Sequence, residues 1–158
     1  MAEDNSQLKP EVRIVGQFVR ESSFENVMAQ TGGGDYTQPK VNVQVSVDAR
    51  KLQGEHRFQS SIKLEISSKA QDTDKVLFLL DVDYVGVFEV KNVSEDQQEA
   101  ILMIECPRLL FPFMRRVISD MVRDGGFPPL NLENIDFVAL YQKEIARRNP
   151  DQRPRADH

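Results

Sequence analysis

The sequence predicts an α+β fold in which four or five antiparallel strands are followed by a helix, a loop and a second helix. Three observations predict it: the first half of the chain alternates apolar and polar residues, residues 107–124 repeat apolar residues at helical spacing, and a second helical pattern begins near Asn134. Strands grouped before helices are typical of a sheet that helices cover on one face or at one end. A chain of 158 residues is long enough for one domain with a substantial core.

The expected strands are recognised by period-two alternation or by short apolar runs. Residues 41–49 give the clearest pattern, because valine occupies every second position from Val41 to Val47. Between the first two strands, residues 21–39 contain three consecutive glycines and are expected to form a long loop of the kind that is usually functional or mobile. The strands are predicted over residues 12–20, 41–49, 56–68 and 75–90, with 99–106 as a fifth.

The first helix is expected to bury one face and to end at Gly125 and Gly126, since glycine tolerates the left-handed conformation in which helices stop. Pro107 fits the first turn, whereas Pro112 makes the regular helix begin or bend there. The segment 127–132 is apolar, but its two prolines exclude an ordinary helix or central strand. The apolar face of the first helix is predicted to contain Leu110, Phe113, Met114, Val117, Ile118 and Met121.

Residues 1–10 and 147–158 are polar and are expected to be flexible ends, which leaves 11–146 as the folded domain. The net charge of −5 argues against nucleic acid and against anionic membrane surfaces as partners. The sequence contains no apolar run near 18 residues and no export signal, so we expect no membrane insertion. A lone Cys106 cannot form an internal disulfide, which favours the cytoplasm.

The sequence carries no catalytic, nucleotide or zinc motif, so we expect neither an enzyme nor a bound cofactor or metal. Cys106 is interpreted as a small buried hydrophobe, although a nucleophilic pair with His56 is conceivable. Asp81 and Asp83 point the same way from one strand. They fit either a cation site or, preferably, a solvated strand face.

Two motifs, CPRLLFP at residues 106–112 and GGFPPLNL at 125–132, resemble those of the bacterial protein-export chaperone family SecB. Further upstream, SFEN at 23–26, the pair Gln38-Pro39 and FLLDVDYVGVF at 78–88 resemble the family at equivalent places. The resemblance covers about residues 12–145 and is most similar to alphaproteobacterial members.

This resemblance implies a homotetramer, built as a dimer of dimers with the long helix at its interface. It also implies grooves between the crossover loop, the sheet and the second helix, in which unfolded preproteins are held without ATP before delivery to the motor SecA. The family's SecA-docking positions fall on Glu21, Phe24, Glu25, Leu79 and Asp81. The basic tail, which contains Arg147, Arg148, Arg153 and Arg155, departs from the acidic or neutral tails of the best-known members, so a tail contribution to SecA binding is not carried over.

Two residue sets follow from combining these motifs with the pattern. Aromatic and leucine side chains in or beside loops are expected to line the client groove, unless they close the core under those loops: Phe24, Tyr36, Phe127, Leu130, Leu132 and Phe137. The wide apolar stripe of the first helix is expected to serve an oligomer interface, unless it serves only the core of its own subunit: Phe113, Met114, Val117, Ile118 and Met121. Two other functions remain open, namely a SecB-like chaperone dedicated to an antitoxin and a small-ligand-binding or enzymatic α+β domain that uses Asp81 and Asp83.

Overall fold

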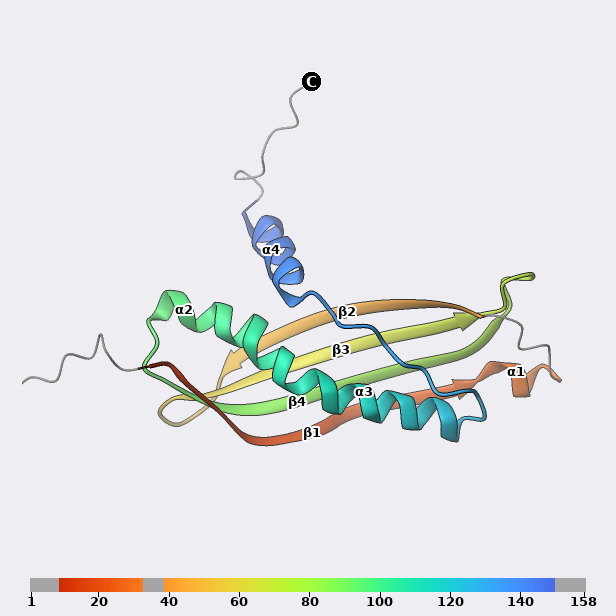
Figure 1. The fold of residues 1–158 in the computed structure, drawn as a ribbon, viewed down its shortest axis with the longest axis horizontal. Helices are drawn as coiled ribbons and strands as arrows, with labels where there is room; N and C mark the ends of the chain where they lie inside the picture. The colour runs from red at the N-terminus through yellow and green to blue at the C-terminus, as the bar shows by residue number, and fades with distance from the viewer. Residues whose placement is uncertain (1–8, 33–38, 150–158) are drawn as a thin grey trace, which may run out of the picture.

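The computed structural model describes residues 9–32 and 39–149, which form a four-stranded antiparallel sheet with the long helix on one face (Figure 1). The strand order is β1-β4-β3-β2, so the chain crosses from one edge of the sheet to the other after β1 and returns by two hairpins. This arrangement confirms the predicted α+β class. The strands are β1 (Glu11–Asn26), β2 (Lys40–Lys51), β3 (Arg57–Lys69) and β4 (Val76–Lys91).

Strand β1 is longer than the pattern at residues 12–20 predicted, because it pairs with β4 as far as Asn26. Its register shifts between Ile14 and Gly16 and again between Val19 and Glu21. Each irregularity interrupts the alternation of faces, which explains why the polar end of β1 was predicted as loop. The short helix α1 (Val27–Gln30) follows, and the side chain of Asn26 caps it by accepting a hydrogen bond from Ala29 N at 2.8 Å.

The predicted fifth strand is wrong, since residues 99–106 are helical. α2 (Glu95–Ala100), the π-helical turn η2 (Ile101–Glu105) and α3 (Cys106–Asp124) follow one another without a break. Ser94 caps the beginning of this helical run by accepting a hydrogen bond from Gln97 N at 3.3 Å. A short apolar run fits a buried strand and a buried helix equally well, and here the cap decides for the helix.

The π-helical turn leaves one buried carbonyl without its usual partner. In η2 the Cys106 N–H donates to Ile101 O, five residues earlier. The next donor in that pattern would serve Leu102 O, but it falls on Pro107, which has no N–H. The buried Ser60 hydroxyl donates to Leu102 O at 2.8 Å instead. A hydroxyl from β3 therefore supplies the hydrogen bond to Leu102 O that Pro107 cannot supply.

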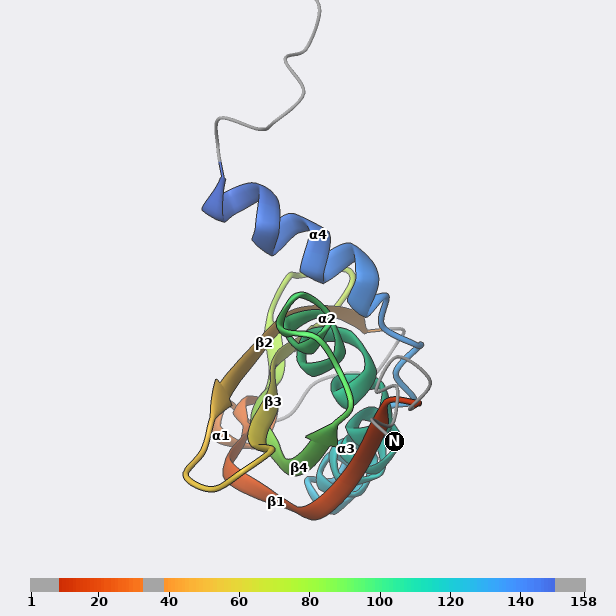
Figure 2. The ribbon, with the colours of Figure 1, turned by 90° about the vertical axis from the view of Figure 1, so that its left-hand side faces the viewer.

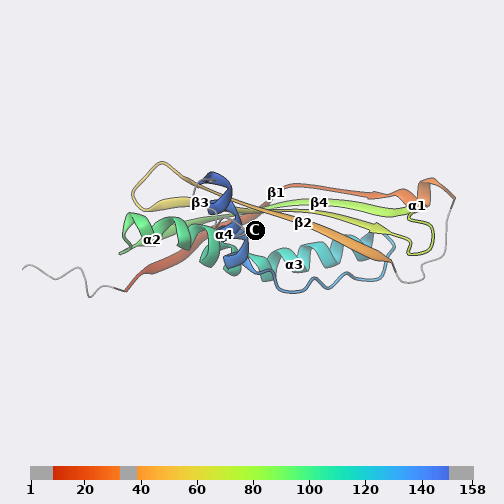
Figure 3. The same ribbon diagram turned by 90° about the horizontal axis from the view of Figure 1, so that it is seen from above.

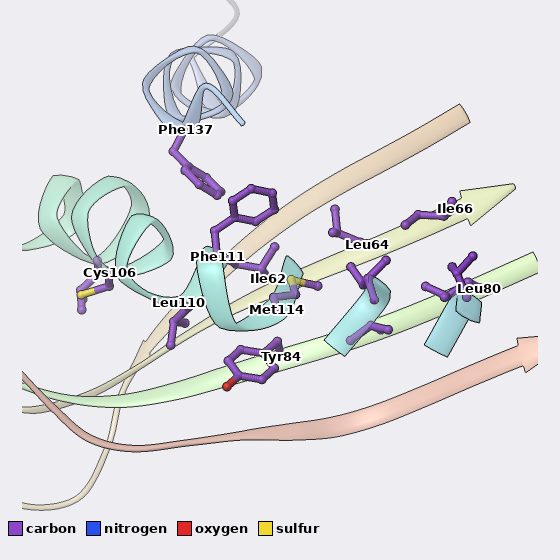
Figure 4. Close-up of a cluster of buried hydrophobic side chains, with 14 of the residues drawn as sticks. Ile62, Leu64, Ile66, Leu80, Tyr84, Cys106, Leu110, Phe111, Met114 and Phe137 are labelled. Atoms are coloured by element: carbon purple, nitrogen blue, oxygen red, sulfur yellow. The ribbon is translucent and has the colours of Figure 1, made fainter. Parts of the chain in front are cut away.

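Helix α3 lies along one face of the sheet and forms the core with it (Figures 1 and 3). Leu110, Met114 and Ile118 are fully buried, as are Ile62 and Leu64 of β3. Figure 4 shows side chains of α3 and of the two central strands meeting between the layers. Cys106 belongs to this core, and burial raises the pKa of its thiol to about 12. The thiol is therefore neutral at physiological pH and is not an activated nucleophile, as the buried-hydrophobe interpretation expected.

Helix α4 (Phe137–Arg148) extends beyond β2 and points away from α3 (Figure 2). It begins three residues after the predicted start at Asn134, because the Asp136 side chain caps it by accepting a hydrogen bond from Ala139 N at 3.0 Å. It continues to Arg148, so two arginines expected in the flexible tail belong to a helix. The rest of that tail, residues 150–158, lies outside the described residues.

Gly86 lies where β4 passes directly under α3. A Cβ atom at this position would come within 2.5 Å of the Phe88 ring and within 2.6 Å of Leu110. We expect Gly86→Ala to lower the free energy of unfolding by about 1–3 kcal/mol through overpacking, measured by urea denaturation. At Gly16 in β1, a Cβ would meet nothing within 4 Å, so Gly16→Ala should stay within about 0.5 kcal/mol of wild type. Equal stability of the two variants would contradict this packing.

Candidate functional site

A trough lies between β2 and α4, on the side of the sheet that carries the helices. Its larger part is a cavity of about 440 Å³ bounded by the end of β2, α2 and α4. Its smaller part is a cavity of about 220 Å³ between β2, η2 and α4. Val47, Met103 and Glu144 line both cavities, so the two adjoin. Clefts of this size are typical of binding sites in proteins.

The floor of the trough is apolar and comes from one face of β2. Val45, Val47 and Ala49 are half-buried and pack against the core, while the residues between them are exposed. Among the residues that the structure describes, β2 is an edge strand that pairs with β3 alone. The outer edge of such a strand presents backbone groups to which an extended peptide can add by β-pairing.

The rim of the trough is charged, but with both signs. Arg147 donates to Glu144 at 2.6 Å, and these hydrogen bonds lower the pKa of the Glu144 carboxyl. Burial and the neighbouring Glu99 carboxylate raise the pKa of Tyr141, which stays protonated and hydrogen-bonds to Glu99. A rim of mixed charge does not select strongly for one sign of ligand. The charged residues around the larger cavity are Asp48, Arg50, Lys51, Glu95, Glu99, Glu144 and Arg148.

A separate cavity of about 170 Å³ lies beneath the proline-containing loop. Apolar residues line most of it, and Ser68 contributes the polar side chain of its wall. The ring of Phe127 packs here, 4.9 Å from Phe78 and 6.3 Å from Phe24. The volume is similar to that of a cavity that accepts a benzene ring. The apolar lining comprises Pro39, Val41, Leu77, Phe78, Val122, Phe127, Pro128, Pro129 and Leu130.

The residues predicted to line a client groove are in three different situations. Phe127 is 5% exposed and Phe137 is 2% exposed, so both rings close the core under the loops, which was the alternative interpretation. Phe137 meets Phe111 edge to face at 6.1 Å (Figure 4). Leu130 and Leu132 are partly buried against the core, and Leu130 also lines the apolar cavity. Tyr36 lies outside the described residues.

Phe24 was predicted both for client binding and for docking of SecA. It is partly buried and stacks on Phe78 at 5.4 Å, so it faces the core and not the outer surface of the sheet. A Cβ atom on Gly125 would come within 2.2 Å of its ring. Phe24 thereby joins the end of β1 to the end of α3.

The trough floor was not among the residues predicted for the site. The strand pattern had marked the valines of β2 as a buried face, without indicating that an edge strand would leave them half-exposed. Met103 was assigned to a strand that does not form. Leu140 and Tyr141 of α4 also line the trough. The signal that could have found these residues is the position of β2 at the sheet edge, which alternation alone does not give.

The other predicted docking residues lie together on the outer face of the sheet. Glu25 pairs with Leu79 across β1 and β4, and Ser23 pairs with Asp81, so this part of the surface is acidic around an exposed leucine. The Asp83 carboxylate forms an ion pair with the Arg20 guanidinium at 2.8 Å. Glu21 and Asp81 line a small depression of about 90 Å³ with Lys63. Within residues 9–32 and 39–149, no group of three or more acidic, histidine or cysteine side chains could hold a metal ion.

The predicted interface stripe of α3 divides between two faces. Met114 and Ile118 are fully buried against the sheet and serve the core of this chain. Phe113 is 42% exposed and Leu109 is 43% exposed, both on the side that faces away from the sheet. Val117 is partly buried between the two faces. The helix therefore carries a second, uncovered apolar stripe.

Comparison with known proteins identifies the family. A family model described as preprotein translocase subunit SecB matches residues 5–148. The protein-export protein SecB of Roseobacter denitrificans is 52% identical over 154 residues, which cover 98% of this chain and 93% of the relative. The protein-export protein SecB of Ruegeria pomeroyi is 54% identical over 138 residues, which cover 87% of this chain and 84% of the relative. Both organisms are alphaproteobacteria, which confirms the predicted resemblance to alphaproteobacterial members of the family.

The fold has a relative among solved structures. The SecB-like chaperone of Mycobacterium tuberculosis, solved in complex with a peptide of the HigA1 antitoxin, superposes with a TM-score of 0.65 at 14% identity, covering 79% of this chain and 91% of its own. At this identity the likeness concerns the fold alone. None of the helices in the described part of the chain is both long and apolar enough to cross a membrane. The family model and the two close relatives together show that the chain belongs to the SecB family of protein-export chaperones.

Proposed function

We propose that the trough between β2 and α4, together with the apolar cavity beneath the proline-containing loop, holds unfolded preproteins and keeps them competent for translocation. The observation that carries this proposal is the half-buried apolar floor of Val45, Val47 and Ala49 on a strand whose outer edge is open. Backbone pairing along such an edge binds any extended chain, and the floor adds affinity for apolar side chains. The names of the close relatives support export clients in preference to a single antitoxin.

Capture of this kind needs no chemical step. An extended segment that covers about 1,000–3,000 Å² gains hydrophobic free energy, much of which is offset by ordering the segment. Binding is therefore reversible, and release does not require bond cleavage. We accordingly propose a chaperone that is not an enzyme, that uses no ATP and that acts in the cytoplasm. The neutral thiol of the buried Cys106 supports this, since it offers no activated nucleophile.

The trough predicts that a charge in its floor weakens client binding. Val47→Asp should raise the Kd for an unfolded precursor about tenfold, because Val47 lines both cavities and a carboxylate there must be desolvated under the client. Fluorescence titration measures the effect. Gln44→Asp is the matched control, since it places the same charge on the opposite, exposed face of β2 and should change Kd less than twofold. Equal affinities of the two variants would remove the trough from the client site.

We further propose that the acidic outer face of β1 and β4 docks SecA. Glu25 lies opposite the 41% exposed Leu79, and Asp81 and Glu21 follow along the same face, which gives an apolar contact with negative charge beside it. Charges at a border act mainly on encounter rate and salt sensitivity. The trough lies on the helical side of the sheet, so the two surfaces are separate and a client and SecA can bind at the same time.

The docking proposal predicts that one charge reversal separates the two activities. Asp81→Lys should lower the affinity for SecA about tenfold at low salt and reduce its salt dependence, while binding of an unfolded precursor stays within twofold. Surface plasmon resonance with immobilised SecA measures the SecA affinity and its salt dependence, and fluorescence titration measures precursor binding. Asp124→Lys, which reverses an exposed carboxylate at the end of α3, should leave both affinities unchanged. SecA affinity that is insensitive to Asp81→Lys would place the docking surface elsewhere.

The uncovered stripe of α3 supports a homotetramer, built as a dimer of dimers. Leu109 and Phe113 would be covered by a second pair of subunits. β1 offers the other association surface, because it is an edge strand with exposed apolar residues along it. The unpaired backbone groups on its outer edge would let the β1 strands of two subunits pair side by side. The exposed residues of β1 are Val15, Phe18 and Val19.

The oligomer proposal predicts dissociation when the stripe becomes charged. Phe113→Asp should lower the mass from tetramer to dimer or monomer in analytical ultracentrifugation, because a carboxylate buried between helices is not compensated. Because Phe113 is 42% exposed in the single chain, the variant should still fold, and circular dichroism checks that it does. Ile145→Asp, at a 36% exposed apolar residue of α4, is the control and should keep the wild-type mass. A tetramer that survives Phe113→Asp would contradict this interface.

A further inference from the structure

Helix α4 is anchored at its two ends and separated from the sheet between them. At its beginning, Phe137 is 2% exposed and packs against Phe111 of α3. At its end, the Arg148 guanidinium forms an ion pair with Glu99 of α2 and a second one with Glu144 of α4 at 3.3 Å. The cavities of about 440 Å³ and 220 Å³ lie between α4 and β2. Figure 2 shows α4 extending above β2, beside α2.

We propose that the Glu99–Arg148 ion pair is a latch that sets the width of the trough by fastening the end of α4 to α2. Both residues line the larger cavity, so the bond between them joins its α2 wall to its α4 wall. Release of the latch leaves α4 held mainly near its beginning, by the buried Phe137 and the partly buried Leu140, so that its far end becomes freer to move. The role is conformational and goes beyond binding of clients by the trough itself.

Between its two ends, α4 is held by partly buried residues such as Leu140 and by the hydrogen bond from Tyr141 to Glu99. Phe137 is its single buried residue, and the segment from 127 to 136 that connects it to α3 contains no helix or strand. Few buried contacts and an irregular connection are typical of a region that opens at low free energy. The ion pair then adds a small bias toward the closed position of the far end, since each of its side chains is about half exposed.

Neighbouring groups orient the latch. Arg147 holds the Glu144 carboxylate through two hydrogen bonds, at 2.6 and 3.1 Å, and Glu144 in turn contacts Arg148. The Tyr141 hydroxyl contacts Glu99 from the same helix face as Arg148. These contacts place the Arg148 guanidinium toward α2. The basic end of the chain, which the proposed docking of SecA does not use, thereby acquires a structural role at Arg147 and Arg148.

An exposed pair of this kind changes populations modestly and is screened by salt. If clients enter when α4 has swung out, weakening the latch raises the open population and the association rate by the same factor. Glu99→Gln and Arg148→Gln each remove the pair and keep the side-chain shape. Glu95→Gln is the matched control, because Glu95 lines the same cavity from α2 and has no ion pair with the residues that the structure describes.

Hydrogen exchange of the full-length protein without a client tests the latch directly. Amides in the last two turns of α4 should exchange about two- to fivefold faster in Glu99→Gln and in Arg148→Gln, with no change in Glu95→Gln. The double variant should match the single variants, because both remove one interaction. Sodium chloride at about 1 M should accelerate the wild type toward the same rate. Wild-type exchange in the single variants, or an additive double variant, would overturn the latch.

Stopped-flow capture of an unfolded precursor tests the consequence for the trough. The association rate should rise in Glu99→Gln by the factor found in exchange, and it should stay at the wild-type value in Glu95→Gln. An exchange effect without a change in association rate would overturn the role of the latch in client entry. The exchange arm uses no client, so its outcome is independent of whether Val47→Asp supports the trough as the client site.

Discussion

One helix covers a sheet that is wider than itself, and the exposed surfaces of the fold follow from this mismatch. A helix with its side chains is about 10 Å wide, whereas the axes of the outer strands in a four-stranded sheet are about 14 Å apart. α3 lies over the central strands, where Ile62 and Leu64 are fully buried. On β2 the residues of the same face, such as Val45 and Val47, are half-buried. An edge strand with an apolar, incompletely covered face is what remains for another chain to use.

The difference in width between α3 and the sheet also explains the positions of the aromatic residues. Phe24, Phe78 and Phe127 gather where α3 ends and the proline-containing loop begins, and Phe137 fills the space beside Phe111. Large rings fill the space beside Phe127 because α3 ends at Asp124 and the loop that follows has no backbone ladder to close the gap. The floor of the proposed trough is thus built of valine and alanine side chains from an edge strand, and the aromatic rings lie in the cavity beneath the proline-containing loop and in the core.

The sequence predicted the helices and strands better than it predicted which faces of them pack together. Alternation located the four strands, and helical spacing located α3, but the apolar stripe of α3 is wide enough to admit two orientations. The spacing selected Phe113 together with Met114, whereas the structure buries Phe111 and leaves Phe113 42% exposed. Periodicity gives the width of a stripe and not the direction of its partner. The π-helical turn was missed for a related reason, because the Ser60 hydroxyl that satisfies Leu102 O is 42 residues away in the sequence.

Tolerance of many clients and a closed resting state make opposite demands on α4. A helix packed firmly on β2 would bury Val45 and Val47 and leave no site, and an unattached helix would expose them to aggregation. Anchoring by one buried ring and one exposed ion pair meets both demands, since the ring at Phe137 fixes the pivot and the pair at Arg148 adds a small, reversible bias. Replacing the pair by a buried apolar contact would strengthen the closed state and slow the entry of clients. For the ATP-independent capture that we propose, a weak closure is the arrangement that lets binding alone open the site.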